Sequence, residues 1–352
     1  MKRTAVPEGG FRRIAVLRLS SLGDVVLALP VVHALRRAYP AADIHFWIKE
    51  EYADLVRFDP AIAHVRVLER DARRLEDLVS MSAELEDCDL IVDLHASARS
   101  RILAFRQRGT VLRLRNRRLD RERWVRARWT RPAPLPHATQ RYAEAIAPLG
   151  VTPDGPPRVT TSATAEAWAR AEAERLAVGR PAGWPIVALC PGARHATKRW
   201  PEERWCALDA LAAGQGWARI VLATPEEQRG LPALAARIAA DAAARWYAEP
   251  LERVAALFSH CSAAVTHDSG LMHLAAARGL RVVALFGSTS PVLGFAPVGE
   301  GHTVLCRDLP CQPCTVHGRE RCPRGHFRCM TTIEPAEVWE HLRETVRASG
   351  AA

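Results

Sequence analysis

The stretch from Cys261 to Pro291 constrains the fold most, because it predicts a strand, a turn, a helix and a second strand in quick succession. Ala263–Thr266 is a short apolar run suited to a buried parallel strand, and the following Asp268 and Ser269 can cap a helix. That helix runs from about residue 271 to Gly279, before the next strand at 281–286. Units of this kind build parallel sheets, so the chain is predicted to be an α/β protein.

The start of this helix is suited to an anionic ligand. A helix that begins right after a parallel strand directs its free N–H groups and the positive end of its dipole above the sheet. Gly270 has no Cβ, which lets a phosphate approach closely, and Asp268 can accept hydrogen bonds from a sugar. These features indicate a nucleotide diphosphate sugar, although an ordinary strand–helix–strand unit with a capped helix has the same spacing.

The same alternation over the remaining chain predicts two α/β domains. The 352 residues, 48% of them apolar, suffice for two cores. We predict a first domain at residues 11–165, a second at 180–334, and a final helix at 335–352 that packs back on the first domain. The helix carries an apolar stripe of Val338, Leu342 and Val346.

Two further loops carry chemically useful side chains. Asp24 follows the first predicted strand, where a carboxylate can act as a general base or can cap the helix predicted from Val25. The loop from Cys190 to Pro201 is rich in small and basic residues, including Lys198. Such a loop can stabilise a departing diphosphate, or it can be a basic surface loop. No GxGxxG follows the first strand, which argues against a dinucleotide cofactor.

Two runs of sequence resemble glycosyltransferase family 9, the heptosyltransferases of lipopolysaccharide synthesis. They are THDSGLMHLAAARGLRVVALFGSTSP and LRLSSLGDVVLALPVVHALRRAYP, and the KRWP and DSGLMH segments are most similar to the second heptosyltransferase. The resemblance implies a GT-B fold, in which two Rossmann-like domains face each other across a cleft. It also implies an inverting transfer of heptose from ADP-L-glycero-D-manno-heptose to the lipopolysaccharide inner core.

The resemblance assigns roles residue by residue. Asp24 matches the catalytic base, and Lys198 matches a lysine that contacts the donor phosphate. Thr197, beside Lys198, is predicted to bind the donor, and either Glu226 or Glu227 is predicted to contact its ribose. Asp268 is predicted to bind the heptose hydroxyls. The residues predicted to surround the phosphates are Ser269, Gly270, Met272 and His273. Acceptor-binding residues are predicted to be Ser21, His95, Arg99 and Arg101.

An arginine-rich block supports an anionic partner. Residues 99–131 contain thirteen arginines but only two acids, and the whole chain has a net charge of +10. We interpret the partners as the phosphorylated lipopolysaccharide acceptor and the anionic surface of the inner membrane. A solvated arginine-rich face is the alternative. Nucleic acid is not expected, because few aromatic residues accompany these arginines.

Four of the nine cysteines have a spacing that resembles a metal site. Cys311, Cys314, Cys322 and Cys329 follow a C-x2-C-x7-C-x6-C pattern, which can hold structural zinc or iron. A branch of the family carries an iron-holding cysteine cluster. Reduced thiols and a redox disulfide remain as alternatives, and no cofactor is expected to be required for the chemistry.

Hydropathy predicts a cytoplasmic protein, and the resemblance implies that it works at the inner face of the inner membrane. No apolar run approaches the length of a membrane-spanning helix, and the basic start, MKRTAVPEGG, is not followed by a signal-peptide core. The main interpretation is therefore a heptosyltransferase. The alternatives are a related transferase with another nucleotide sugar or a protein acceptor, and an arginine-rich nucleic-acid-binding protein.

Overall fold

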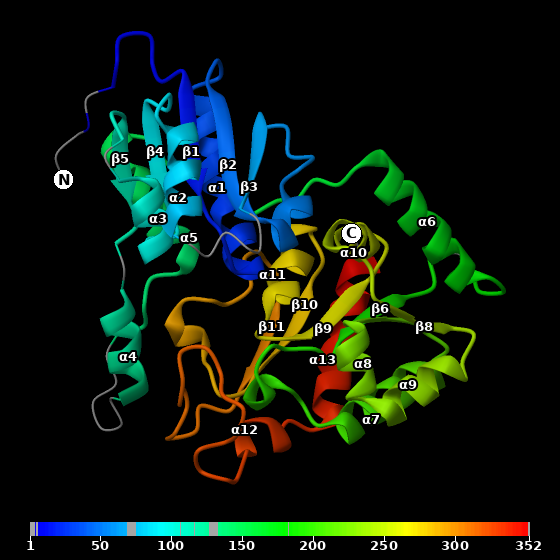
Figure 1. Ribbon diagram of the computed structural model, residues 1–352. Coiled ribbons are helices and arrows are strands. Elements are labelled where there is room, and N and C mark those ends of the chain that lie inside the picture. Colours follow the sequence, from blue (N-terminus) through cyan, green and yellow to red (C-terminus); the bar gives the residue numbers. More distant parts are fainter. Residues whose placement is uncertain are drawn as a thin grey trace. The chain divides into compact units, whose positions relative to one another are not determined.

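The computed structural model describes residue 4 and residues 6–68, 75–105, 107–115, 117–126, 133–181 and 183–350 (Figure 1). The chain divides into two compact units. Unit 1 comprises Met1–Arg117 and Pro136–Thr161, and unit 2 comprises Arg118–Leu135 and Ser162–Ala352. Three arginines of the predicted basic block, Arg106, Arg128 and Arg131, lie outside the described residues.

Unit 1 is a parallel five-stranded sheet in the order β3-β2-β1-β4-β5. The order reverses between β1 and β4, and loops at such a reversal form the usual ligand site of an open α/β sheet. Ala15, Leu17 and Ile91 face a core that includes Leu78 and Leu103 from the helices between strands. Its elements are β1 (Arg13–Leu17), α1 (Leu22–Ala38), β2 (Asp43–Lys49), η1 (Glu50–Leu55), β3 (His64–Leu68), α2 (Leu75–Ser82), η2 (Ala83–Leu85), β4 (Leu90–Asp93), α3 (Ala98–Leu103), β5 (Thr110–Arg113), α5 (Ala138–Ile146) and η3 (Ala147–Leu149).

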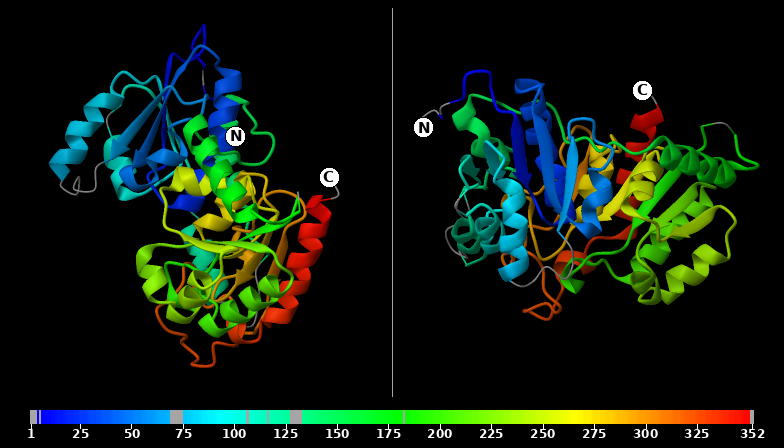
Figure 2. Two further views of the ribbon diagram at one scale, coloured as in Figure 1. Left: turned by 90° about the vertical axis from the view of Figure 1, so that its right-hand side faces the viewer. Right: turned by 45° about the horizontal axis from the view of Figure 1, so that its top comes forward.

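Unit 2 is a parallel six-stranded sheet in the order β11-β10-β9-β6-β7-β8. Its reversal lies between β6 and β9, which carry the two loops singled out in the sequence. Figure 2 shows this sheet and its covering helices from two further directions. Its elements are α4 (Arg118–Arg126), α6 (Ala163–Ala177), β6 (Ile186–Cys190), η4 (Ala196–Lys198), α7 (Glu202–Gly214), β7 (Ala218–Leu222), α8 (Pro225–Arg229), α9 (Pro232–Ala239), β8 (Ala244–Tyr247), α10 (Leu251–Phe258), β9 (Ala263–His267), α11 (Gly270–Ala277), β10 (Val282–Phe286), η5 (Pro291–Leu293), β11 (Thr303–Cys306), α12 (Arg328–Thr331) and α13 (Pro335–Gly350).

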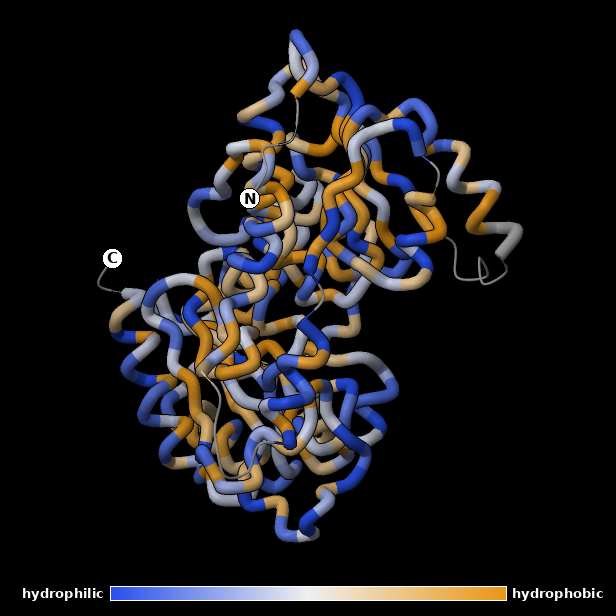
Figure 3. The backbone as a smooth tube through the Cα atoms, turned by 90° about the vertical axis from the view of Figure 1, so that its left-hand side faces the viewer, coloured by the Kyte–Doolittle hydropathy of each residue, from blue (hydrophilic) through white to orange (hydrophobic). Residues whose placement is uncertain are grey.

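The central strands of unit 2 are buried along their whole length. Every residue of β6, β7, β9 and β10 is buried, which explains why these strands read as continuous apolar runs rather than alternating ones. Hydrophobic segments accordingly lie in the interior of each unit, whereas the outer helices mix polar and apolar residues (Figure 3). Among the described residues, no helix combines the length and apolar character needed to cross a bilayer.

Two features differ from the expected domain organisation. Arg118–Leu135 interrupts unit 1 and belongs to unit 2, so the first unit is discontinuous in sequence. The final helix, α13, places Val338, Leu342 and Val346 in the core of unit 2. It packs against α7, β9 and β10. The stripe predicted to dock on the first domain is therefore used within the second.

Candidate functional site

Asp24 lies at the carboxyl end of β1, in the first turn of α1. The helix starts at Leu22 with Ser21 in the N-cap position, so Asp24 is not the cap of a helix that starts at Val25. Three groups hold its carboxylate. Arg18 Nη2 lies 2.8 Å from Oδ2, Ser21 Oγ donates to Oδ2 at 2.9 Å, and the Tyr142 hydroxyl donates to Oδ1 at 2.6 Å. The side chain is about one-fifth exposed, at 20%, so the carboxylate is well ordered but still accessible.

These contacts also set the charge of the site. Burial alone would raise the pKa of Asp24, but the Arg18 guanidinium and the hydroxyls of Tyr142 and Ser21 hold that pKa well below its ordinary value. Asp24 is therefore a carboxylate at any physiological pH. Arg18 is itself fixed, because its Nη1 donates to the Leu94 carbonyl at 2.6 Å. The end of β1 is thereby tied to the end of β4.

His95 and α3 occupy the neighbouring loop after β4. Burial, with the nearby Arg18 charge, lowers the pKa of His95 to about 4, so its imidazole is neutral near pH 7. Its Nδ1 is buried with no hydrogen-bond partner among the described residues. Asp93 stabilises the turn, since its Oδ1 accepts from the backbone N–H of His95 at 3.1 Å and its Oδ2 accepts from Arg113 at 2.8 Å.

The predicted acceptor residues therefore lie around one end of the unit 1 sheet. Ser21 and His95 follow the adjacent strands β1 and β4. Arg99 and Arg101 lie on α3, directly after that second strand. Together with the ionised carboxylate of Asp24, the neutral His95 imidazole and these guanidinium groups form a set that can bind an anionic sugar and accept a proton from its hydroxyl.

In unit 2, Lys198 and Asp268 form a direct ion pair between the two predicted loops. Lys198 Nζ donates to Asp268 Oδ2 at 2.7 Å and to the Asp268 carbonyl at 3.0 Å. Thr289 Oγ1 donates to the same carboxylate oxygen at 2.6 Å. Burial would raise the pKa of Asp268, but Lys198 and Thr289 lower it overall. The loops after β6, β9 and β10 thus converge on one charged pair.

The start of α11 provides hydrogen-bond donors beside this pair. Ser269 is the N-cap residue, yet its side chain makes no capping bond. Its Oγ is buried and has no hydrogen-bond partner within the described ranges. Gly270 opens the helix, and the first backbone N–H groups of α11 are available to an anion. The Met272 and His273 side chains are buried, at 0% and 5% exposed, so Met272 can offer a ligand only its backbone.

Thr197 holds loops together rather than lining an open surface. Its side chain is 3% exposed, and Oγ1 lies 2.9 Å from Ser288 Oγ. The same oxygen accepts the Arg319 N–H at 2.8 Å, while the Thr197 N–H donates to the Arg319 carbonyl at 2.9 Å. Thr197 therefore positions the adjacent Lys198. His267 anchors the other end of this loop, because its Nε2 accepts the Trp200 N–H at 2.8 Å.

The two glutamates after β7 have different surroundings. Glu227 forms a capping box with Thr224 at the start of α8. It also lies against Gly192 of the Lys198 loop, so closely that a Cβ at position 192 would come within 2.2 Å of Glu227 Oε1. Glu226 is exposed on the helix surface. Only Glu227 is thereby held beside the predicted donor loop.

The four late cysteines lie around one small cavity. Cys311, Cys314, Cys322 and Cys329 line it together with His326, and all four are free thiols. Burial raises the pKa of Cys314, and raises that of Cys329 to about 12, which keeps both protonated near pH 7. Across the part of the chain that the structure describes, no three His, Cys, Asp or Glu side chains are arranged to hold a metal ion. The predicted zinc or iron therefore has no support here.

Several residues of the candidate site gave no usable signal in the sequence. Arg18 is inside an apolar strand run, and Tyr142 is 118 positions from the aspartate that it contacts. Gly192 and His267 could have been noticed, because each lies in a loop or strand end already singled out. Thr289 also lies in a polar loop that the sequence placed at a strand's carboxyl end.

Comparison with known proteins gives a consistent result for the whole chain. The family model for glycosyltransferase family 9 (heptosyltransferase) matches residues 79–322. Lipopolysaccharide heptosyltransferase 1 from Pseudomonas aeruginosa is 28% identical over 324 residues, which cover 86% of this chain and 86% of that protein.

Solved structures show the same architecture. A glycosyltransferase family 9 protein from Veillonella parvula has a TM-score of 0.79 at 21% identity, covering 96% of this chain and 98% of that one. The ADP-heptose lipopolysaccharide heptosyltransferase II of Escherichia coli has a TM-score of 0.71 at 20% identity, covering 96% and 99%. These similarities confirm the predicted GT-B fold class.

Proposed function

The chain belongs to glycosyltransferase family 9, the heptosyltransferase family, and from this premise we propose how it transfers heptose. The donor is ADP-L-glycero-D-manno-heptose, and the acceptor is a hydroxyl of the lipopolysaccharide inner core. The observation that carries the proposal is the family match over residues 79–322, which includes both Lys198 and Asp268. The lipopolysaccharide heptosyltransferase 1 from P. aeruginosa, similar over 86% of the chain, supports transfer of heptose to lipopolysaccharide.

Asp24 is the general base of this proposal. Its carboxylate takes the proton of the acceptor hydroxyl while that oxygen attacks C1 of the heptose. The bond from C1 to the ADP oxygen breaks, its electron pair leaves with ADP, and the configuration at C1 inverts. A carboxylate with a low pKa is a weak base, so the proton moves late, as the acceptor oxygen gains positive charge. Arg18 and Tyr142 are positioning residues that hold the carboxylate.

Unit 2 holds the departing ADP. Lys198 and the N–H groups at the start of α11 stabilise the charge that develops on the diphosphate. Ser269 Oγ, which lacks a partner among the described residues, supplies one more donor. Asp268 accepts hydrogen bonds from the heptose hydroxyls, and Glu227 accepts those of the ribose because it lies beside Gly192.

The acceptor binds through the groups at the end of the unit 1 sheet. Ser21 and His95 contact its hydroxyls, and Arg99 and Arg101 pair with its phosphates or carboxylates. Because this acceptor is a membrane glycolipid and the chain carries a net charge of +10, we place the reaction at the anionic inner face of the inner membrane. The lysine and helix dipole supply the charge that a metal provides in other transferases, and the proposed chemistry requires none.

Asp24→Asn tests the catalytic assignment. The amide cannot accept the proton, so transfer to a heptose-deficient lipopolysaccharide should fall by about 100-fold or more. The Kd for ADP-heptose, measured by titration calorimetry, should stay within about twofold, because no donor contact is lost. Transfer at the wild-type rate would refute the role of Asp24. Loss of donor binding would instead show that the substitution disturbs the fold.

A further inference from the structure

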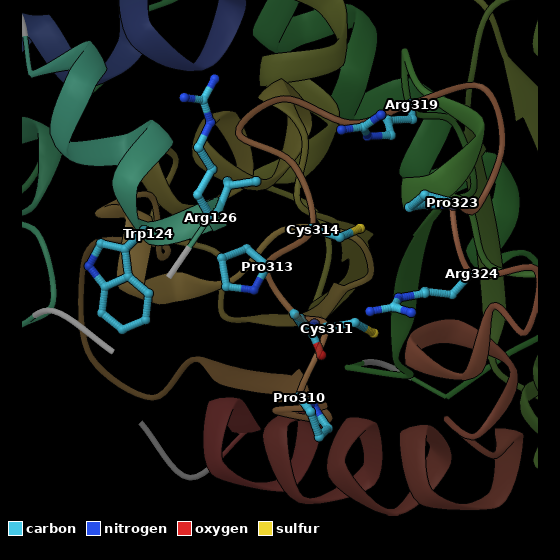
Figure 4. A pocket seen from close by; sticks show the side chains of 11 residues that line it. Trp124, Arg126, Pro310, Cys311, Pro313, Cys314, Arg319, Pro323 and Arg324 are labelled. Carbon is cyan, nitrogen blue, oxygen red and sulfur yellow. The ribbon is translucent and has the colours of Figure 1, made fainter. Parts of the chain in front are cut away.

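A cavity of about 630 Å³ lies within unit 2, between α4 and the loop that carries the cysteines. Figure 4 shows Trp124 and Arg126 extending from α4 on one side. Arg319 and Arg324 extend from the other side, with Pro313 between them. Lys198, Asp268 and the residues of α11 are not among the described residues that line this cavity.

The described residues that line this cavity are cationic. The charged ones among them are Arg126, Arg319 and Arg324, and none of these described lining residues is Asp or Glu. Arg126 has an ion pair with Glu122 of its own helix, but at 3.7 Å and with 81% of its side chain exposed. The two guanidinium groups of Arg319 and Arg324 have no ion pair among the described residues. Such a pocket attracts anions, and planar guanidinium groups bind phosphate or carboxylate bidentately.

The backbone that carries these arginines is firmly anchored. Gln312 Nε2 donates to the carbonyls of Phe286 at 3.1 Å, Gly287 at 2.7 Å and Thr289 at 3.0 Å. Arg319 exchanges hydrogen bonds with Thr197, the residue before Lys198. The Arg319 guanidinium therefore starts from a fixed backbone position, which lowers the entropy cost of binding a ligand.

The remaining walls are suited to a sugar ring. Trp124 is 6% exposed, and its indole N–H donates to the Ala133 carbonyl at 2.9 Å, so the ring is held in place. Pro313 and Pro323 add apolar surface to the lining. A concave site that combines several guanidinium groups with a few fixed ring surfaces, in a cavity of this volume, suits a small polar ligand.

We infer that this pocket binds a phosphate-bearing sugar of the acceptor. The inference rests on the proposed function and adds a second acceptor contact, in unit 2, to the one at the end of the unit 1 sheet. The arginines pair with the anionic group, while the sugar ring packs on the proline surfaces. The pocket thereby selects acceptors that carry a negative charge beside the hydroxyl-bearing sugar.

The test compares Arg319→Ala/Arg324→Ala with the matched control Arg321→Ala. Arg321 is exposed in the same loop but does not line the cavity. The double variant should raise the KM for phosphorylated acceptor by about tenfold or more, since each lost charge-assisted bond weakens binding. Its KM for ADP-heptose and its kcat should stay near the wild-type values. With dephosphorylated acceptor, the double variant, the control and the wild type should have equal KM values.

Three results would overturn the inference. An unchanged acceptor KM would mean that the pocket is not used, and a raised ADP-heptose KM would assign these arginines to the donor. An equal loss with dephosphorylated acceptor would show that the anionic group is not recognised. Flotation with anionic phospholipid vesicles that lack the glycan should give no difference between the variants; a difference would assign the arginines to the membrane. If the wild type transfers no heptose, the proposed function fails instead, and direct titration with the phosphorylated glycan still tests the pocket.

Discussion

At the scale of single residues, the central feature is a carboxylate held by three partners. The sequence predicts Asp24 as a catalytic residue because Asp24 follows the end of a strand and lies in a motif that resembles one of glycosyltransferase family 9. The partners Arg18 and Tyr142 were not predictable, since both contacts depend on tertiary packing. The same distinction applies in unit 2. Lys198 and Asp268 were both predicted, but their direct ion pair could be seen only once the loops were folded.

The depressed pKa of Asp24 predicts how activity depends on pH. The carboxylate is ionised in the folded protein from neutral to mildly acidic pH, so kcat/KM should be flat from about pH 8 to about pH 5. Its contribution to stability is present above about pH 4, the ordinary aspartate pKa, and is lost as pH falls toward the depressed value. This account would be contradicted if kcat/KM fell as the pH dropped below about 6 and if Asp24→Glu moved that fall to another pH. Donor binding over the same pH range serves as the control.

At the scale of elements, the helix starts that follow strands carry most of the residues to which we assign the proposed chemistry. The buried strands β6, β7 and β9 were predictable because their apolar runs are continuous. The short edge strands β8 and β11 were not predicted, because each has four residues and includes partly exposed positions. The start of α1 was misplaced by three residues, since Leu22 and Gly23 are not strong helix-start signals.

Gly192→Ala tests whether the loop after β6 and the start of α8 form one ribose site. An added Cβ would meet the Glu227 carboxylate and displace it from its capping position. The Kd for ADP-heptose should rise by about tenfold, by calorimetry, because a hydrogen bond to a charged group is lost. Gly214→Ala is the control, since nothing lies within 4 Å of its added Cβ. It should be neutral or stabilise the protein by up to about 1 kcal/mol. Unchanged donor affinity in Gly192→Ala would remove Glu227 from the site.

At the scale of the whole molecule, we assign the acceptor to one α/β unit and the nucleotide-sugar donor to the other. Their number and class were predictable from the alternation of strands and helices along the chain. The assignment of Arg118–Leu135 to unit 2 was not predictable, because no change in composition marks the start of this segment within the arginine-rich block. The use of α13 within unit 2 was also not predictable, since an apolar stripe does not identify the surface that it covers.

The most direct test of the whole account is mass spectrometry of a heptose-deficient lipopolysaccharide after incubation with the purified protein. Parallel reactions should contain ADP-heptose, GDP-mannose or UDP-glucose. The account predicts that the acceptor gains the mass of one heptose with ADP-heptose only. Transfer from another nucleotide sugar, or no mass change in all three reactions, would contradict it.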